Sequence, residues 1–353
     1  MNKKSMLYIM GIDWEWIYQR PQIIADKLAG DFSVTVLFPR SITKCFRKRP
    51  RTEGKDYRIL WTIPYQEKNK ILYRLSRVIN SGIWKDISQF DYVYVGYPLY
   101  GRYLPEDYPG KIIYDCMDNH EALYPDQKRV VRVLEQEKAL VKRSDLLVVS
   151  AELLKQKMDA IAGNSESVLI RNGVQVKDIC AVSCAGKKKR YSLCYIGTIS
   201  EWFDFSLLEK SLSECPDLDY HLIGPAVKKR EHDRITYHGP VSHEELGEAI
   251  RDYDCLIMPF RVNEIVSSVD PVKLYEYIAF GKCIISVFYP EIERFSDYVY
   301  FYRSEEEYIR LLQTLMAEGF PPKYDSTMQK EFLAKNTWDM RYQLLKEKID
   351  DIG

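Results

Sequence analysis

A lysine and a glutamate three residues apart carry the most specific chemistry in this sequence. Lys273 and Glu276 fall within the segment 258–286, where an apolar run is followed by a polar loop and then by a helical pattern. Residues three apart share one face of a helix. An ammonium group near a helix start can pair with a diphosphate, and a carboxylate one turn later can accept hydrogen bonds from two hydroxyls. The spacing also suits an ordinary surface ion pair, and spacing alone favours that simpler interpretation.

The turn in front of this helix has the composition of a helix start. Pro271 suits the first helical turn, where its missing N–H costs nothing, and Asp270 or Ser268 can cap that turn. We expect a helix over about 272–280, ended by Gly281. Helix starts at the carboxyl ends of strands are where α/β sheets bind ligands, and their free N–H groups favour a phosphate.

Two aspartates follow another strand-like run, 112–114. Asp115 and Asp118 stand where side chains reach the ligand edge of a parallel sheet, so either could bind hydroxyl groups or act as a base. Helix capping is the alternative, because aspartate and asparagine cap readily. The neighbouring His120 is interpreted as structural, as lone histidines usually are.

The segment after the first strand-like run, 6–10, is the third candidate. Gly11 and Asp13 lie at that strand's end, and Trp14, with Trp16 beyond it, could stack on a sugar or simply pack in the loop. Arg20 could reach the ligand edge or pair with a local acid. The second role is favoured, because the RPQ sequence begins a helical pattern.

Two sets of strands must position these residues. Apolar runs and helical patterns alternate along the chain, which is typical of parallel sheets with crossover helices. The first set of strands is 6–10, 34–38, 91–95, 112–114 and 145–150, with helices over 20–29 and 126–143. After a basic stretch, 183–190, the second set is 193–197, 220–224, 235–239, 254–260 and 283–288. Helical segments over 328–349 end the chain.

Composition excludes several classes of protein. The chain has 353 residues, enough for two domains, and its 51 basic and 51 acidic residues leave no net charge to attract nucleic acid. No run approaches the roughly 18 apolar residues that span a bilayer. The 8 cysteines show no zinc-ligand spacing and are expected in a reduced cytosol. The two DxD triplets, at 217–219 and 252–254, precede their strands, so we expect no metal site.

Several blocks, in order, resemble bacterial glycosyltransferases of the GT4 type, especially the branch that makes teichuronic acid and other surface polysaccharides. PVKLYEYIAFGKCII resembles the family's P-x-K-x-x-E-Y-x-A-x-G-K segment, in which the glutamate matching Glu276 binds the donor ribose. The remaining blocks are WIYQRPQIIADKLA, IIYDCMDNHEALY, SDLLVVSAELL, IRNGV, YIGTISEWFDFSLL, HLIGP and NTWDMRYQLL. The resemblance implies the α/β GT-B fold, with two Rossmann-like domains facing across a cleft. It implies domains 1–183 for the acceptor and 184–325 for the nucleotide sugar, and a C-terminal helical segment, 326–353, returning to the first domain.

The sequence departs from the family in two places. The first of the family's two glutamates is replaced by Ser268, so the donor sugar cannot be inferred. The Arg and Lys that usually follow Gly197 are absent, which leaves Arg261 and Lys273 as the nearest cations. The resemblance implies the following donor-binding set: Glu276, Lys273, Arg261, Ser267, Ser268, Asp270, Gly197 and Thr198. It implies Asp118 and Asp115 as catalytic residues, and Gly11, Asp13, Trp14 and Arg20 as the acceptor and phosphate loop.

We therefore expect transfer of a sugar from a UDP- or GDP-type nucleotide sugar to a growing cell-surface glycan, with retention and without metal or other cofactor. The alternatives are another GT-B reaction, such as epimerisation or hydrolysis, and a non-catalytic sugar-nucleotide-binding partner. The acceptor would be a glycan or a lipid-linked glycan, and no nucleic acid is involved.

Location at the inner face of the plasma membrane, or free in the cytoplasm, is expected. A basic segment, 44–55, includes Arg47, Lys48, Arg49 and Arg51, and an apolar stripe follows it at Ile71, Leu75, Ile79 and Ile83. Both features suit an anionic membrane surface. For the stripe, a crossover helix covering the sheet is slightly favoured.

Overall fold

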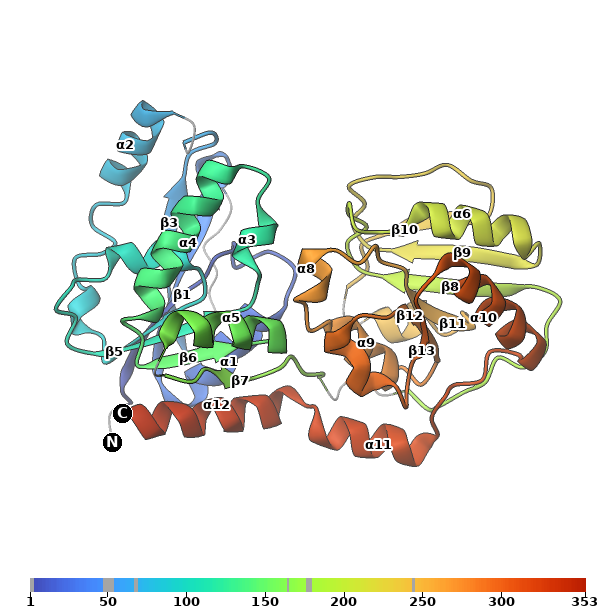
Figure 1. Cartoon of the computed structure of the whole chain (residues 1–353). Helices are drawn as coiled ribbons and strands as arrows, with labels where there is room; N and C mark the ends of the chain where they lie inside the picture. Colours follow the sequence, from blue (N-terminus) through green and yellow to red (C-terminus); the bar gives the residue numbers. More distant parts are fainter. Residues whose placement is uncertain (1–2, 47–53, 67–68, 164, 176–179, 243–244) are drawn as a thin grey trace. The chain divides into compact units, whose positions relative to one another are not determined.

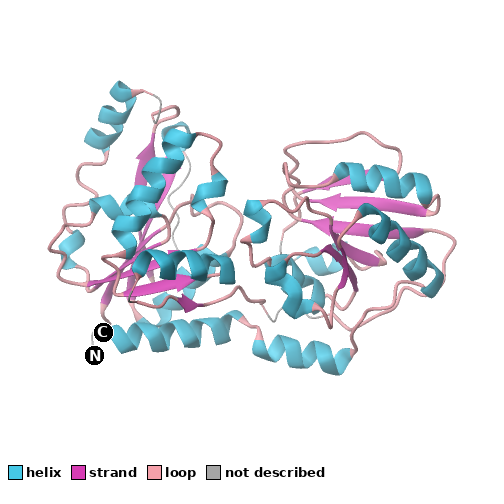
Figure 2. Cartoon of the chain, viewed as in Figure 1, coloured by secondary structure: helices cyan, strands magenta, loops and turns pink. Residues whose placement is uncertain are grey.

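The computed structural model describes residues 3–46, 54–66, 69–163, 165–175, 180–242 and 245–353. The chain divides into two compact units (Figures 1 and 2). Unit 1 comprises Met1–Arg171 with Tyr342–Gly353, and unit 2 comprises Asn172–Arg341. Each unit is a parallel sheet with helices on its faces (Figure 2), so the α/β class with two Rossmann-like sheets is confirmed.

The sheet of unit 1 has the strand order β3-β2-β1-β4-β5-β6-β7. Its strands are β1 Ser5–Ile9, β2 Ser33–Ser41, β3 Lys55–Thr62, β4 Tyr92–Val95, β5 Lys111–Cys116, β6 Leu146–Val149 and β7 Val168–Leu169. Its helices are α1 Arg20–Asp31, α2 Lys70–Ile79, α3 His120–Leu123, α4 Gln127–Val141 and α5 Glu152–Ala162, with 3-10 turns Ile42–Lys44, Ile87–Gln89 and Pro98–Tyr103. Central strands such as β1 and β4 are buried on both faces, which explains their continuous apolar sequences.

The sheet of unit 2 has the strand order β10-β9-β8-β11-β12-β13. Its strands are β8 Tyr191–Ile196, β9 Leu218–Ile223, β10 Ile235–Gly239, β11 Cys255–Met258, β12 Cys283–Val287 and β13 Tyr300–Tyr302. Its helices are α6 Phe205–Glu214, α7 Leu246–Ala249, α8 Glu264–Ser267, α9 Val272–Ala279, α10 Glu305–Glu318 and α11 Ser326–Lys335, with a 3-10 turn at Pro290–Phe295. Alternate residues of β8 enter two separate apolar cores, one on each face of the sheet.

The boundaries of the units differ from the predicted ones. The chain enters unit 2 at Asn172 rather than at 184, because Asp270 and Arg341 bind the backbone of Asn172 and because Val174 pairs with Thr337. The predicted C-terminal segment, 326–353, is also divided. Helix α11 lies in unit 2, and the division falls within the last helix, α12 Trp338–Ile352.

The favoured prediction that the apolar stripe of α2 covers the sheet is wrong. Ile71, Leu75 and Ile79 are exposed on α2, whereas Ile83 lies beyond the end of the helix and packs against the core of unit 1. The basic residues Arg47, Lys48, Arg49 and Arg51 fall outside the described residues. Among the described helices, none combines the length and apolar character that crossing a membrane requires.

Candidate donor and acceptor sites

The start of α9 meets the end of β8 at a glycine. Gly197 follows β8 with φ of +136°, a value that side chains rarely tolerate, and a Cβ added there would lie 2.2 Å from Cε of Lys273. The Lys273 side chain therefore crosses directly over the Gly197 backbone. A larger residue at position 197 would displace the lysine, so glycine is required for this contact as well as for the turn.

One buried tyrosine fixes α9 against the sheet. The Tyr277 hydroxyl accepts a hydrogen bond from the Ile196 backbone N–H at 3.0 Å and donates one to the Ile257 carbonyl at 3.3 Å. These partners belong to β8 and β11, whose carboxyl ends lie beside α9. The predicted placement of this helix start at the carboxyl ends of strands is therefore confirmed, and helix bounds of Val272–Ala279 agree with the expectation.

Lys273 carries a charge that the protein does not neutralise directly. Within the described residues the Lys273 ammonium forms no ion pair, and its nitrogen lies 5.8 Å from the centre of the Tyr195 ring. Burial lowers the pKa of Lys273, and the nearby Glu276 carboxylate raises it by less. An ammonium group in this setting is suited to an anionic ligand, because such a ligand would supply the missing counter-charge.

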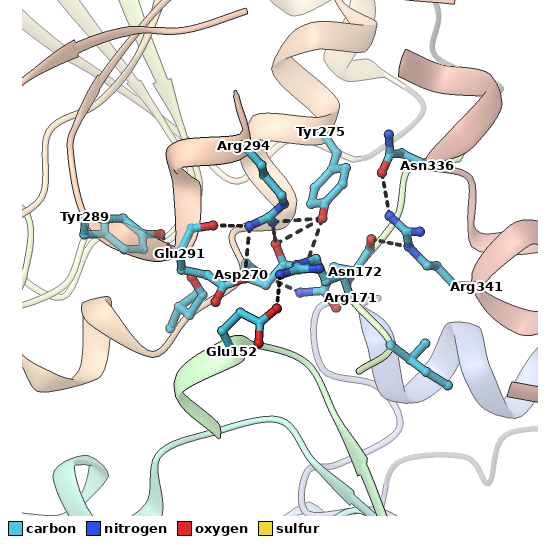
Figure 3. Close-up of polar contacts among 12 residues, drawn as sticks. Glu152, Arg171, Asn172, Asp270, Tyr275, Tyr289, Glu291, Arg294, Asn336 and Arg341 are labelled. Carbon is cyan, nitrogen blue, oxygen red and sulfur yellow. Dashed lines mark hydrogen bonds and ion pairs between the residues drawn. The ribbon is translucent and has the colours of Figure 1, made fainter. Parts of the chain in front are cut away.

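Asp270 is occupied by structural contacts (Figure 3). Its carboxylate accepts hydrogen bonds from the Asn172 backbone N–H at 2.5 Å and the Tyr275 hydroxyl at 3.1 Å, and it also pairs with Arg294. The predicted cap is wrong, because Pro271 is the N-cap of α9 and no side chain caps the helix. Asp270 instead ties the turn before α9 to the beginning of unit 2.

The other predicted donor residues lie in different surroundings. Arg261 is exposed and pairs with Asp204, the residue that caps α6, at 3.3 Å. Ser267 ends α8, a short helix within the predicted loop, and Ser268 is buried with its hydroxyl donating to the Ile265 carbonyl at 2.8 Å. Of the predicted donor set, the structure places Gly197, Thr198, Lys273 and Glu276 together around the start of α9 and the end of β8.

In unit 1, Asp115 forms a buried ion pair with Arg20. Both side chains are almost completely buried, and the guanidinium contacts the two carboxylate oxygens at 2.9 and 3.1 Å. The Tyr94 hydroxyl donates to the same carboxylate at 2.8 Å, and Arg20 also donates to the Ile170 carbonyl. Burial alone would lower the pKa of Arg20, but Asp115 raises it on balance. This pair joins α1 to the sheet, so the structural role favoured for Arg20 extends to Asp115.

Asp118 is exposed, in the turn between β5 and α3. Two residues further along the chain, His120 belongs to a buried network that sequence analysis missed. Nδ1 of His120 lies 2.8 Å from a carboxylate oxygen of Glu137 in α4, and the Tyr114 hydroxyl donates a hydrogen bond to the same oxygen. Cys116, His120 and Glu137 offer ligand atoms within 4.8 Å of one another and could hold a metal ion. The Cys116-x3-His120 spacing was a signal for this group, but Glu137 lies on a separate helix and could not be assigned from spacing.

A buried arginine anchors the loop after β1. Arg40 of β2 donates to both carboxylate oxygens of Asp13, at 2.9 and 3.1 Å, so Asp13 anchors the loop. Trp14 packs edge-on against Tyr57, with ring centres 5.1 Å apart, which supports loop packing for that residue. A Cβ added to Gly11 would lie 3.0 Å from Cβ of Tyr97, so the loop also runs close to the second residue after β4.

Comparison with known proteins relates this chain to glycosyltransferases. A family model described as glycosyl transferase-like matches residues 206–347. TuaH of Bacillus subtilis (strain 168), assigned to teichuronic acid biosynthesis as a glycosyltransferase, is 22% identical over 283 residues, which cover 72% of this chain and 70% of TuaH.

Solved structures show the same fold. The lipopolysaccharide outer core galactosyltransferase WaaB is 12% identical with a TM-score of 0.68, covering 98% of this chain and 99% of WaaB. Anabaena HepE, solved with UDP and glucose, is 10% identical with a TM-score of 0.67 over 98% of this chain and 99% of its own. A trehalose-phosphate synthase from Burkholderia vietnamiensis has a TM-score of 0.67 at 11% identity, with 99% of each chain covered. The solved structures show the GT-B fold, and the family model together with TuaH identifies the chain as a glycosyltransferase of the GT4-like kind and a distant homologue of TuaH.

Proposed function

We propose that unit 2 binds a UDP- or GDP-type nucleotide sugar at the start of α9. Lys273 pairs with the diphosphate, the backbone at Gly197 and Thr198 approaches it closely, and Glu276 accepts hydrogen bonds from the ribose. The observation that carries this proposal is the Lys273 side chain lying across Gly197 without an ion pair in the described residues. A cation already in place stabilises the charge that develops on a leaving diphosphate.

We further propose that unit 1 binds the acceptor, a growing cell-surface glycan or its lipid-linked form. The description of TuaH supports a surface polysaccharide as the product. Asp118 is the acidic side chain proposed to contact acceptor hydroxyls, because Asp115 is held by Arg20 and Tyr94 while Asp118 is exposed. We propose transfer with retention and without a metal at the diphosphate. The protein would work at the cytoplasmic face of the membrane.

The direct test combines ligand binding with product analysis. A thermal-shift series over UDP- and GDP-sugars identifies the donor, because a ligand that binds only the folded state raises its stability by about 2.7 kcal/mol at a hundred times its Kd. The selected donor is then incubated with oligosaccharide acceptors, and the products are analysed by mass spectrometry and NMR. An elongated glycan is expected. A free or isomerised sugar in place of an elongated glycan would contradict the proposal.

A further inference from the structure

Helix α2 is attached to unit 1 by its polar residues. Ser76 is buried and donates from its hydroxyl to the Trp61 carbonyl at 3.3 Å. Asn80, the C-cap residue, exchanges two hydrogen bonds with the backbone of Trp61, at 2.8 and 2.9 Å. Trp61 belongs to β3, the edge strand of the sheet, and α2 lies at that end of unit 1 (Figure 1). The side of α2 that faces the protein therefore contains polar anchors.

The opposite side of α2 is apolar and faces solvent. The exposed fractions are 76% for Ile71, 49% for Leu75, 69% for Val78 and 40% for Ile79. Their spacing of four, three and one residues puts them in one stripe along the helix. This arrangement is the reverse of an ordinary surface helix, which buries its apolar stripe against the core. An apolar stripe directed outward is typical of a surface that binds a partner.

The charges beside the stripe indicate the chemistry of that partner. Lys70, Arg74 and Arg77 are exposed, and α2 contains no acidic residue. In the part of the chain that the structure describes, no carboxylate pairs with these three cations. A protein partner would need acidic groups placed around an apolar centre, whereas an anionic lipid surface offers both features over its whole area. Ten residues are too few to span a bilayer and sufficient to lie within its interface.

We propose that α2 docks unit 1 on an anionic lipid surface, with Ile71, Leu75, Val78 and Ile79 inserted between headgroups and the three cations beside the phosphates. The inference deepens the proposed membrane location and rests on it, because it assigns the contact to one helix. Docking through unit 1 would bring the acceptor-binding unit to a lipid-linked glycan. The donor site in unit 2 takes no part in it.

The test uses two α2 variants and two matched controls from the same unit. The apolar variant is Leu75→Gln with Val78→Gln, and its control is Val131→Gln on α4, where the side chain is also 53% exposed. The charge variant is Arg74→Gln with Arg77→Gln, and its control is Arg132→Gln with Lys138→Gln, exposed cations of α4. Binding is measured by co-sedimentation with vesicles of phosphatidylglycerol and phosphatidylcholine, or of phosphatidylcholine alone, at low and high salt. Melting temperatures show that each variant is folded.

Wild-type protein is expected to bind the anionic vesicles and to dissociate from them as salt rises. The charge variant should lower partitioning about 30-fold at low salt, since each cation near the surface contributes a factor of about five. The apolar variant should lower it by at least about tenfold at every salt concentration. Both control variants should bind within about twofold of wild type.

Three results would overturn the inference in distinguishable ways. If wild type ignores all vesicles, both the membrane location and the role of α2 are wrong. If wild type binds and the α2 variants bind equally well, membrane contact remains but α2 is not its site. If the α2 variants bind normally and instead dissociate a dimer in analytical ultracentrifugation, the stripe is covered by a second copy. Sugar transfer to a soluble acceptor is measured separately, so failure of the transferase proposal would appear in that assay alone.

Discussion

Each unit holds charged side chains near the carboxyl ends of its strands, but the partners of these side chains differ between the units. In unit 1, Arg20 and Asp115 are buried together and satisfy each other through two close contacts, with Tyr94 completing the carboxylate's partners. In unit 2, Lys273 lies over Gly197 and forms no ion pair within the described residues. In the first arrangement the two charges are taken up by each other. The second leaves a charge available to a ligand, so position in the fold does not by itself identify a functional residue.

Asp115→Asn should have the largest effect on stability. It removes the charge that balances a buried guanidinium, and breaking one partner of such a pair costs about 3–5 kcal/mol. The free energy of unfolding, measured in urea, should fall by that amount. The exposed Asp118→Asn is the control and should change stability by less than about 0.5 kcal/mol. Similar stabilities for the two variants would show that the ion pair is not structural.

Glu276→Ala should affect binding rather than folding. If the carboxylate accepts hydrogen bonds from the donor ribose, its loss should weaken donor binding by about 1.5–3 kcal/mol in calorimetry. The unfolding transition should remain close to that of wild type. A folded variant with unchanged donor affinity would remove Glu276 from the site.

Alkaline pH should weaken donor binding through Lys273. Burial lowers the pKa of this ammonium below its usual value of 10.5, so it loses its proton at a lower pH than an ordinary lysine. The charged form is the one that binds a diphosphate, so affinity should decline as pH rises through the lowered pKa. In the free protein the sign is opposite, because the unfolded chain then holds more protons and stability rises with pH. Titration calorimetry from neutral to alkaline pH should show the decline in wild type and lose it in Lys273→Met.

Chelation should have the smallest effect. The proposed mechanism places a lysine and backbone groups at the diphosphate, where a metal-dependent enzyme would place Mg²⁺. Transfer activity should therefore stay within about twofold of its starting value after EDTA. Complete loss that Mg²⁺ or Mn²⁺ restores would overturn the metal-free mechanism.

Local sequence predicted the parts of the site that depend on neighbouring residues. The strand, loop and helix order before Gly281 follows from apolar runs, a proline and a glycine, and the glycine has the positive φ that ends such a helix, +68°. Partners that are distant in the chain were not predictable. Arg20 meets Asp115 across 95 residues, and the Tyr277 hydroxyl reaches two strands that only the folded sheet brings together.

Some strands at the edges of the two sheets were not predicted from the sequence, for a related reason. Strand β3 is at the edge of its sheet and mixes charged with apolar residues, and β13 is only three residues long. Helix α2 has the pattern of a helix that covers a sheet, and the same pattern suits one that faces outward. The direction of its apolar stripe depends on where Ser76 and Asn80 find partners, which is a property of the tertiary structure.

The central claim is that Lys273 is held over Gly197 to bind the donor diphosphate, and one calorimetric comparison tests it most directly. The nucleotide sugar selected by thermal shift is titrated into wild type, Lys273→Met and the control Lys330→Met, an exposed lysine of α11. Loss of a charged partner should weaken binding by about 1.5–3 kcal/mol in Lys273→Met, with wild-type affinity in Lys330→Met and no loss of stability in either. Equal affinity in all three proteins would contradict the account and exclude Lys273 from donor binding.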